Sequence, residues 1–194
     1  MPQTQSQPVP AFSPAISNRR AGGIAELAAE VSAACDETPL AMKVRIRAAL
    51  ERAVADPGLL SAEQRTTRAD CYARHVIYSD PLGRFTILAI VWGPGQFSPP
   101  HAHDTWCAYA VHENPLQETL FALGAGGTKA KQVCTEARNP GYSCFAGAGL
   151  DQIHRLGNSG AVPAISIHAY GVGRERISSH VNRIVEIGMK EDQS

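Results

Sequence analysis

The hydrophobic positions of the chain follow two periods, one helical and one typical of strands. In residues 24–37 the apolar side chains recur every three or four positions, which predicts an amphipathic helix. The same spacing over residues 40–56 predicts a second helix, which an Asp-Pro-Gly turn ends. Ser61 and Gln64 match a helix-capping pair, so a short third helix is expected to begin there.

From about residue 71 the pattern changes to that of strands. Residues 71–79 alternate between apolar and polar side chains, and residues 84–93 form a nearly continuous apolar run. Further strand-like runs, separated by Gly, Pro and Asn, span residues 105–113, 118–123, 129–136, 142–145, 151–156 and 163–170. Many short strands at this spacing predict a sandwich or barrel, so we expect a mainly β fold preceded by two or three N-terminal α-helices.

One change of composition bears on the domain boundaries. Residues 1–22 are rich in Pro, Gln and Ser and lack periodicity, which predicts a flexible N-terminal arm. No internal repeat and no long linker follows. We therefore expect a single domain over residues 23–194, with the helices in 23–70 and the barrel in 71–190.

Composition narrows the class of protein. The 194 residues are 44% hydrophobic and 19% charged, as in a globular protein, and 18 basic residues balance 18 acidic ones. A net charge of zero offers no basic surface for nucleic acid, and no apolar run is long enough for a membrane span or a signal segment. Five cysteines without a C-x-x-C pair argue against a disulfide framework and favour a reducing compartment, so we expect a cytoplasmic protein. The oligomeric state stays open.

The candidate chemistry concentrates on histidine. His101 and His103 are separated by a single residue and follow two prolines. On a strand, residues i and i+2 face the same side, so both imidazoles would project together. Two neutral imidazoles on one face make half of a binding site for a first-row metal ion.

A third metal ligand has to come from elsewhere in the chain. His154 and His168 both lie in predicted strands, and Asp104 and His112 lie close to the His-x-His pair in sequence. The residue pattern alone leaves these four open as candidates.

Two segments resemble the paired motifs of the cupin superfamily. The first is residues 95–107, which read Gly95, five residues, His101-x-His103, three residues and Cys107. In cupins a metal-binding glutamate normally stands where this chain has Cys107. The resemblance implies a small antiparallel, jelly-roll-like β-barrel that holds a metal ion.

The second segment, residues 141–158, is similar to the second cupin motif. It implies that His154 joins the two histidines of the first motif as the third metal ligand. The gap from Gly149 to His154 is longer here than in the usual motif.

Three histidines without a carboxylate resemble the site of the thiol dioxygenases related to cysteine dioxygenase type I. The resemblance runs from about Tyr72 to Tyr170 and implies iron(II) as the cofactor, with a small thiol carboxylate and O2 as its partners. Members of this family add both oxygen atoms to the thiol sulfur, which gives a sulfinic acid. Because a coordinating thiol binds as thiolate, it supplies the negative charge that a carboxylate ligand would otherwise contribute.

Ser166, His168 and Tyr170 resemble the Ser-x-His-x-Tyr chain of this family, which implies catalytic roles for all three and substrate contacts for the last two. Alternation puts them on one face of a strand, as a relay requires, although an ordinary amphipathic strand has the same spacing. In animal cysteine dioxygenases the cysteine at the position of Cys107 is joined to the tyrosine by a thioether. The resemblance therefore allows a Cys107–Tyr170 thioether, although His103 and Cys107 are one residue closer here than in those enzymes.

Tyr72 and Arg74 resemble the pair that binds the substrate carboxylate in the cysteine dioxygenases. A guanidinium presents a planar fork that matches a carboxylate, whereas a lone arginine on a strand can also be simply solvated. Many 3-mercaptopropionate dioxygenases have glutamine at this position, so Arg74 favours cysteine as the substrate. Mercaptosuccinate is a further alternative if Arg174 or Arg176 turns toward the site instead of lying on the surface.

Two other classes of protein also fit three histidines. A zinc hydrolase uses three histidines and a water molecule, but no carboxylate stands out as its general base. A non-catalytic metal-binding cupin would not need the Ser-x-His-x-Tyr chain.

Overall fold

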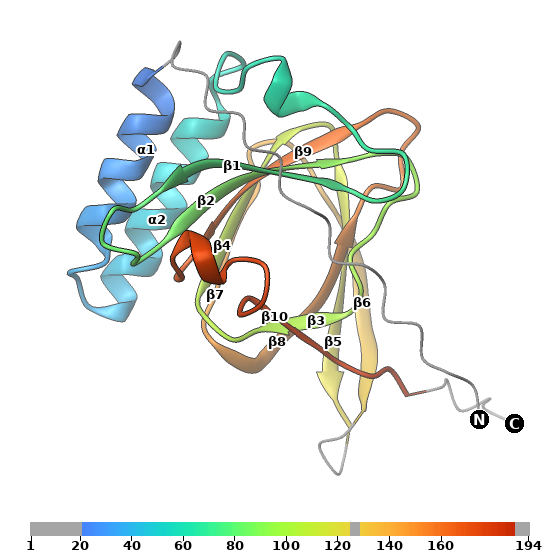
Figure 1. Cartoon of the computed structure of the whole chain (residues 1–194). Coiled ribbons are helices and arrows are strands. Elements are labelled where there is room, and N and C mark those ends of the chain that lie inside the picture. The colour runs from blue at the N-terminus through green and yellow to red at the C-terminus, as the bar shows by residue number, and fades with distance from the viewer. Residues whose placement is uncertain (1–20, 125–128, 189–194) are drawn as a thin grey trace, which may run out of the picture.

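The computed structural model describes residues 21–124 and 129–188 (Figure 1). The predicted arm, residues 1–22, lies outside the described residues except for its last two, which begin the first helix. Residues 189–194 of the predicted domain also lie outside them.

Two α-helices precede the strands. α1 spans Ala21–Ala34 and α2 spans Pro39–Val54. Thr38 caps α2, because its hydroxyl accepts a hydrogen bond from the Ala41 amide at 3.5 Å. Pro39 follows the cap in the first turn, where its missing N–H has no helical partner to lose.

The predicted third helix is a single 3-10 turn, η1, at Glu63–Arg65. The capping pair forms as expected: the Ser61 amide donates to Gln64 Oε1 at 3.0 Å, and the Gln64 amide donates to Ser61 Oγ at 3.4 Å. The chain then becomes extended at Thr66, so the cap starts a turn that does not continue. The helix count in the described residues is therefore two.

The structure describes ten strands. Their bounds are β1 Ala73–Ser79, β2 Thr86–Trp92, β3 His101–His103, β4 Cys107–Glu113, β5 Leu116–Leu123, β6 Ala130–Arg138, β7 Ser143–Ala146, β8 Gly149–Gly157, β9 Ala164–Tyr170 and β10 Asn182–Ile184. Every strand-like run in the sequence overlaps one of them, and the two three-residue strands, β3 and β10, lie outside the predicted runs.

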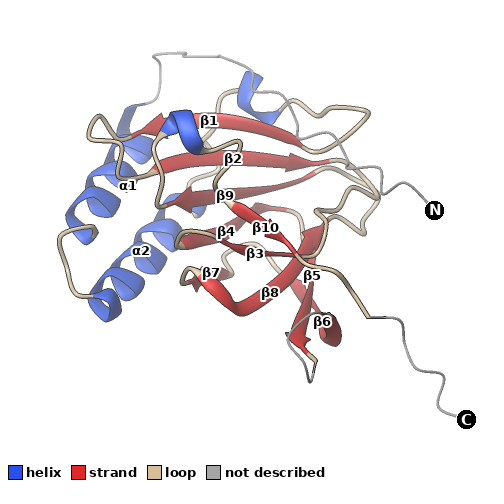
Figure 2. Ribbon diagram, turned by 60° about the horizontal axis from the view of Figure 1, so that its bottom comes forward, coloured by secondary structure: helices blue, strands red, loops and turns tan. Residues whose placement is uncertain are grey.

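The strands form two antiparallel sheets of five strands each (Figures 1 and 2). The first sheet has the order β1-β2-β9-β4-β7, and the second has the order β10-β3-β8-β5-β6. After β2 the chain therefore changes sheets at every connection between consecutive strands except the one from β5 to β6. In Figure 2, α1 and α2 lie against the outer side of the first sheet.

The first sheet is buried on both faces, which explains the nearly continuous apolar run of β2. Alternate β2 side chains belong to the core shared with the helices, and those between them belong to the core shared with the second sheet. The helix-side residues are Ile87, Ala89 and Val91, and the inner residues are Leu88, Ile90 and Trp92.

The second sheet is buried mainly on its inner face. Its edge strand β6 is largely exposed, whereas β5 and β8 contribute Leu116 and Leu156 to the core between the sheets. The candidate site lies between the two inner faces. None of the helices in the described residues is both long enough and apolar enough to cross a membrane.

Candidate metal centre

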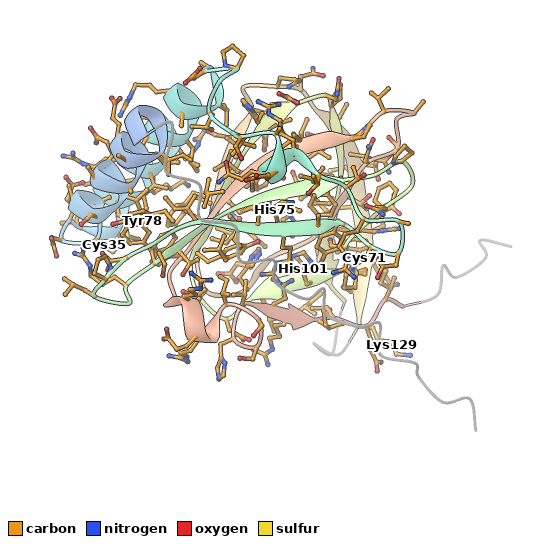
Figure 3. All side chains as sticks on the ribbon, turned by 45° about the horizontal axis from the view of Figure 1, so that its top comes forward. Cys35, Cys71, His75, Tyr78, His101 and Lys129 are labelled. Atoms are coloured by element: carbon orange, nitrogen blue, oxygen red, sulfur yellow. The ribbon has the colours of Figure 1, made fainter. Side chains whose placement is uncertain are left out.

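Three histidines converge between the two sheets. His101 and His103 lie on β3 and His154 lies on the adjacent β8, and one ligand nitrogen of each lies within 4.8 Å of the others. The ring centroids are 4.6, 5.0 and 5.3 Å apart, and all three side chains are buried. Figure 3 shows His101 inside the body of strands, whereas Cys35 and Tyr78 lie at the end beside the helices. Of the candidates for the third position, His154 is the one that joins the His-x-His pair.

β8 bulges beside this cluster. His101 pairs with His154 and His103 pairs with Gly149, so one residue on β3 faces four on β8. Gly149 has a φ of 118°, a backbone conformation that glycine adopts without strain. The bulge accounts for the long gap between Gly149 and His154, because the additional residues leave the ladder while His154 stays in register.

Hydrogen bonds behind the rings orient two of the histidines. His101 Nδ1 donates to the Pro99 carbonyl at 2.8 Å, and His154 Nδ1 donates to the Glu118 carboxylate at 2.7 Å. Each ring therefore keeps Nε2 as the atom with a free lone pair. His154 Nε2 and His103 Nδ1 are buried and have no hydrogen-bond partner within the described part of the chain. A bound cation would satisfy such atoms, so the residues fit a metal ion.

The buried environment keeps His101 and His103 uncharged. Burial, with a contribution from His154, lowers the pKa of His101 to about 3. Burial and the neighbouring His101 lower the pKa of His103 to about 2. Neutral imidazole is the form that binds a metal ion, so His101 and His103 are already in the required protonation state at neutral pH.

Glu118 on β5 extends the contacts behind His154, and sequence reasoning did not single it out. Its carboxylate is 2% exposed and also accepts a hydrogen bond from Arg138 Nε at 2.7 Å. Burial acts to raise the pKa of Glu118, but the hydrogen bonds from His154 and Arg138 outweigh it, and the pKa is lowered overall. The Arg138 guanidinium also lies 4.3 Å from the ring centre of Tyr142.

Ser166, His168 and Tyr170 share the inner face of β9 and form a hydrogen-bonded chain. Ser166 Oγ lies 2.8 Å from His168 Nε2, and the Tyr170 hydroxyl lies 3.1 Å from His168 Nδ1. Trp92 Nε1 donates to Ser166 Oγ at 2.9 Å and adds a fourth member that the sequence did not indicate. All four residues are buried. Burial, with smaller contributions from His154 and His103, holds the pKa of His168 well below its usual range.

Cys107 faces Tyr170 across β4 and β9. The two are direct partners in the strand register, and each is among the groups that shift the pKa of the other. Burial holds the pKa of the Cys107 thiol well above its usual range. The short spacing from His103 to Cys107 therefore does not turn the thiol away from Tyr170.

A small polar cavity of about 20 Å³ adjoins the histidine cluster. Arg74 lines it and is 7% exposed, so this arginine is not a solvated strand residue. Its Nη2 donates to the Ile177 carbonyl at 3.1 Å. Tyr72 also lines the cavity, and its ring lies 4.5 Å from the ring of Trp92 at an interplanar angle of 31°.

Asn182 on β10 lines the same cavity. It pairs directly with His103 in the strand register. Its Oδ1 atom is buried and lacks a hydrogen-bond partner among the residues that the structure describes. An unsatisfied buried polar atom beside the histidine cluster is a candidate contact for a ligand.

The remaining candidates lie outside the site. His112 Nδ1 donates to the Val54 carbonyl at 3.0 Å and ties β4 to α2. Asp104 is exposed at the end of β3. Arg174 and Arg176 form the exposed turn η2 and do not line the cavity that holds Arg74.

Two antiparallel sheets that enclose three buried histidines define a mainly β protein with an interior suited to a metal ion. The sequence model of cysteine dioxygenase type I matches residues 65–182, so the chain belongs to that family. The resemblance found in the sequence is thereby confirmed.

Several solved structures are similar to part of the chain. A conserved protein with a double-stranded β-helix domain from Klebsiella pneumoniae is 18% identical, with a TM-score of 0.45 over 62% of this chain and 88% of that one. A protein from Thermus thermophilus is 19% identical, with a TM-score of 0.43 over 58% and 95% of the two chains. An oxalate oxidase is 18% identical, with a TM-score of 0.43 over 61% and 63%. Similarity at this level does not extend to function.

Proposed function

We propose that the protein is an iron(II)-dependent thiol dioxygenase, which converts a small thiol carboxylate to its sulfinate with O2. Cysteine is the first candidate substrate, and 3-mercaptopropionate and mercaptosuccinate are the alternatives. The observation that carries the proposal is the cluster of three buried histidines beside the hydrogen-bonded chain of β9. Membership of the cysteine dioxygenase type I family supports the reaction class, and with it a cupin-type barrel for the two sheets.

His101, His103 and His154 are the residues that would hold the iron. Imidazole suits several first-row metals, so the ligand types alone do not select iron over zinc. When bound, the metal would supply positions at which a thiol and O2 meet and would favour the thiolate form of the substrate. Cys107 is outside the histidine cluster, and its raised pKa supports a protonated thiol that does not compete as a ligand.

Arg74 is our candidate for binding the substrate carboxylate. Its guanidinium keeps its positive charge when buried, and it lines the polar cavity that reaches the histidine cluster. Tyr72 lies on the same wall and offers a hydroxyl donor.

Asn182 is our candidate for the amino group of cysteine. Its buried Oδ1 is a hydrogen-bond acceptor at the wall of the same cavity, and an amino group is a donor. 3-Mercaptopropionate and mercaptosuccinate have no amino group, so an acceptor at this place favours cysteine over both.

The hydrogen-bonded chain of β9 would hold a proton on the Tyr170 hydroxyl oxygen. Its members are Trp92, Ser166, His168 and Tyr170. An indole N–H can only donate, so Ser166 Oγ accepts from Trp92 and can give its own proton to His168 Nε2. His168 then donates from Nδ1 to the Tyr170 oxygen. With this order of donors and acceptors, the Tyr170 hydroxyl hydrogen can be donated to the substrate or to Cys107. Tyr170 therefore acts as a hydrogen-bond donor at the cavity wall.

The polar cavity has to widen when a substrate binds. A volume of about 20 Å³ holds roughly one water molecule, and a thiol carboxylate is several times larger. β10 carries Asn182 and is a three-residue edge strand that pairs with β3. Outward movement of β10 would enlarge the cavity and would break fewer strand pairs than movement of a longer or central strand.

Oxygen uptake by the iron-loaded protein tests the proposed activity. We expect cysteine to be consumed together with O2 in equal amounts, with the sulfinate identified by mass spectrometry. Turnover of 3-mercaptopropionate or mercaptosuccinate instead would change the substrate and keep the reaction. Hydrolytic activity of a zinc-loaded protein without O2 uptake would support the zinc hydrolase, and no activity in either form would support a non-catalytic metal-binding cupin.

Two variants test the residue assignments. Arg74→Gln should lower kcat/KM about 30-fold to 150-fold, because loss of a charge-assisted contact costs roughly 2–3 kcal/mol. Arg176→Gln on the exposed turn η2 is the matched control. His154→Ala should abolish stoichiometric iron binding. Unchanged kinetics in Arg74→Gln, or full iron content in His154→Ala, would refute the corresponding assignment.

The setting of the protein is a further part of the proposal. All five cysteines are free thiols, which supports a reducing location such as the cytoplasm. We also propose that the helices and both sheets make one folded domain, because α1 and α2 share a hydrophobic core with the first sheet.

A further inference from the structure

A second and larger cavity reaches the histidine cluster from between the two sheets. Its volume is about 310 Å³, and strands from both sheets contribute to its walls. It shares His103 and His154 with the polar cavity, but its other wall residues are different. The metal ligands therefore have a polar space on one side and a separate, much larger space on another.

The walls of the larger cavity are mostly apolar. Leu120, Phe121, Ile153 and Ala146 line it, together with aromatic rings and thiols. Its charged wall residues are Glu118, Arg138 and Asp151. Glu118 and Arg138 neutralise each other through a hydrogen bond of 2.7 Å, so the described walls offer no spare cation for a carboxylate.

The bulge of β8 forms one rim of this cavity. Asp151 and Gln152 belong to the residues that leave the ladder between Gly149 and His154, and both are exposed. Val133 lies on β6, also lines the cavity and is 66% exposed. The bulge and β6 therefore mark the place where the cavity meets solvent.

We infer that the larger cavity is a binding site and entry route for dioxygen, separate from the polar cavity that takes the thiol carboxylate. The inference rests on the proposed function, because it assigns O2 as the gas. An apolar cavity favours a small uncharged gas over a charged thiol, since a charged group would lose its hydration without gaining a counter-ion. The shared ligands His103 and His154 bring the gas to the metal without passage through the carboxylate site.

Xenon is the first probe, because it binds in apolar cavities and needs no turnover. Crystals of the metal-free and of the iron-loaded protein are pressurised with xenon. We expect xenon density near Leu120, Phe121 and Ile153 in both. Density absent from this cavity in both crystals would overturn the inference.

Substitutions that fill the cavity are the second probe. Val133→Trp should cover the exposed rim, and Ala146→Leu should narrow the interior. Each is expected to raise the KM for O2 at least threefold and to leave the KM for the thiol unchanged. Val44→Trp on α2, where the native valine is 62% exposed, is the matched control. A raised KM for the thiol with an unchanged KM for O2 would make this cavity the thiol site and overturn the inference.

The two probes separate this inference from the proposed function. Xenon bound in a protein that oxidises none of the thiols would refute the dioxygenase and still support a gas-binding cavity. Thiol oxidation by a protein whose cavity excludes xenon would support the dioxygenase and refute the gas site. Val133→Trp keeps the kinetic test usable if Ala146→Leu does not fold, because residue 133 is on the surface.

Discussion

Glu118 Oε1 accepts a hydrogen bond from Nδ1 of His154 at 2.7 Å, while Glu118 Oε2 accepts one from Arg138 at the same distance. The buried carboxylate stays ionised because the hydrogen bonds from His154 and Arg138 outweigh the effect of burial on its pKa. It therefore fixes the tautomer of His154 that leaves Nε2 for a metal ion. The third metal ligand thus depends on two residues from neighbouring strands that do not belong to the histidine cluster.

Glu118→Gln should weaken metal binding. The amide can still contact His154, but it loses the negative charge that fixes the imidazole, and changes of this kind cost about 10-fold to 100-fold in metal affinity. Glu136→Gln is the control, because Glu136 pairs with Arg138 from the exposed side. Metal titration of both variants measures the effect, and equal dissociation constants would rule out the orienting role.

Asn182→Leu should change substrate preference. Loss of an acceptor for a charged amino group is expected to lower kcat/KM for cysteine about 10-fold, at a cost near 1.5 kcal/mol. The kcat/KM for 3-mercaptopropionate should stay the same as in the wild type, because this thiol has no amino group. Competition assays with both thiols give the ratio directly, and a parallel loss for the two would show a merely structural role.

Ser166→Ala should lower kcat and leave the KM for the thiol nearly unchanged. Without the serine hydroxyl, His168 Nε2 and Trp92 Nε1 lose their shared partner, and the proton on Tyr170 is no longer fixed. We expect at least a tenfold loss in kcat, within the range of proton-positioning effects. Thr119→Val removes a different buried hydroxyl bond and controls for stability. Similar rates for the two variants would exclude the relay.

A thioether between Cys107 and Tyr170 should form during turnover with iron and O2. The bond joins Sγ to a ring carbon and removes one hydrogen from each, with O2 as the oxidant. Intact mass after denaturation should fall by two hydrogen atoms in the wild type and stay constant in Cys107→Ser. Cys144→Ser, which keeps the reacting pair, should behave like the wild type. An unchanged wild-type mass after many turnovers would contradict the bond.

Acid should destabilise the metal-free protein below about pH 6.5. In the unfolded chain a histidine takes up a proton near its usual pKa of 6.5, whereas the buried His101 does so only near pH 3 and His103 near pH 2. The unfolded state therefore binds more protons throughout this window, and the free energy of unfolding falls by up to about 1.4 kcal/mol per pH unit for each histidine. Urea unfolding between pH 5 and 7.5 measures the slope, and a flat profile would contradict it.

Much of the fold could be predicted because its signals are local. The periods of α1, α2 and the long strands are visible in the sequence, and the burial of β2 on both faces produces its continuous apolar run. The prediction of a third helix was wrong because a capping pair can start a helical turn but does not supply the tertiary packing that extends the turn into a helix. β3 and β10 were missed as strand runs because three residues are too few to show a period.

The residues of the candidate site were likewise predicted only in part. Spacing alone predicted that His101 and His103 would share a face, whereas the choice of His154 needed the resemblance to a family. Glu118 and Asn182 could not be predicted, because their roles come from strand pairing across the sheet and not from neighbours in the chain. The bulge of β8 left one trace, the long gap between Gly149 and His154, but the gap does not reveal the space beside it.

The burial of the first sheet on both faces has a consequence for how short this protein can be made. The family match begins at residue 65, after both helices, yet the helices cover Ile87, Val91 and the apolar residues beside them. A chain cut to the matched region would expose the apolar, helix-facing side of the first sheet to water and should aggregate. It would nevertheless keep every residue of the histidine cluster. The segment that identifies the family is thus smaller than the unit that buries both faces of the first sheet.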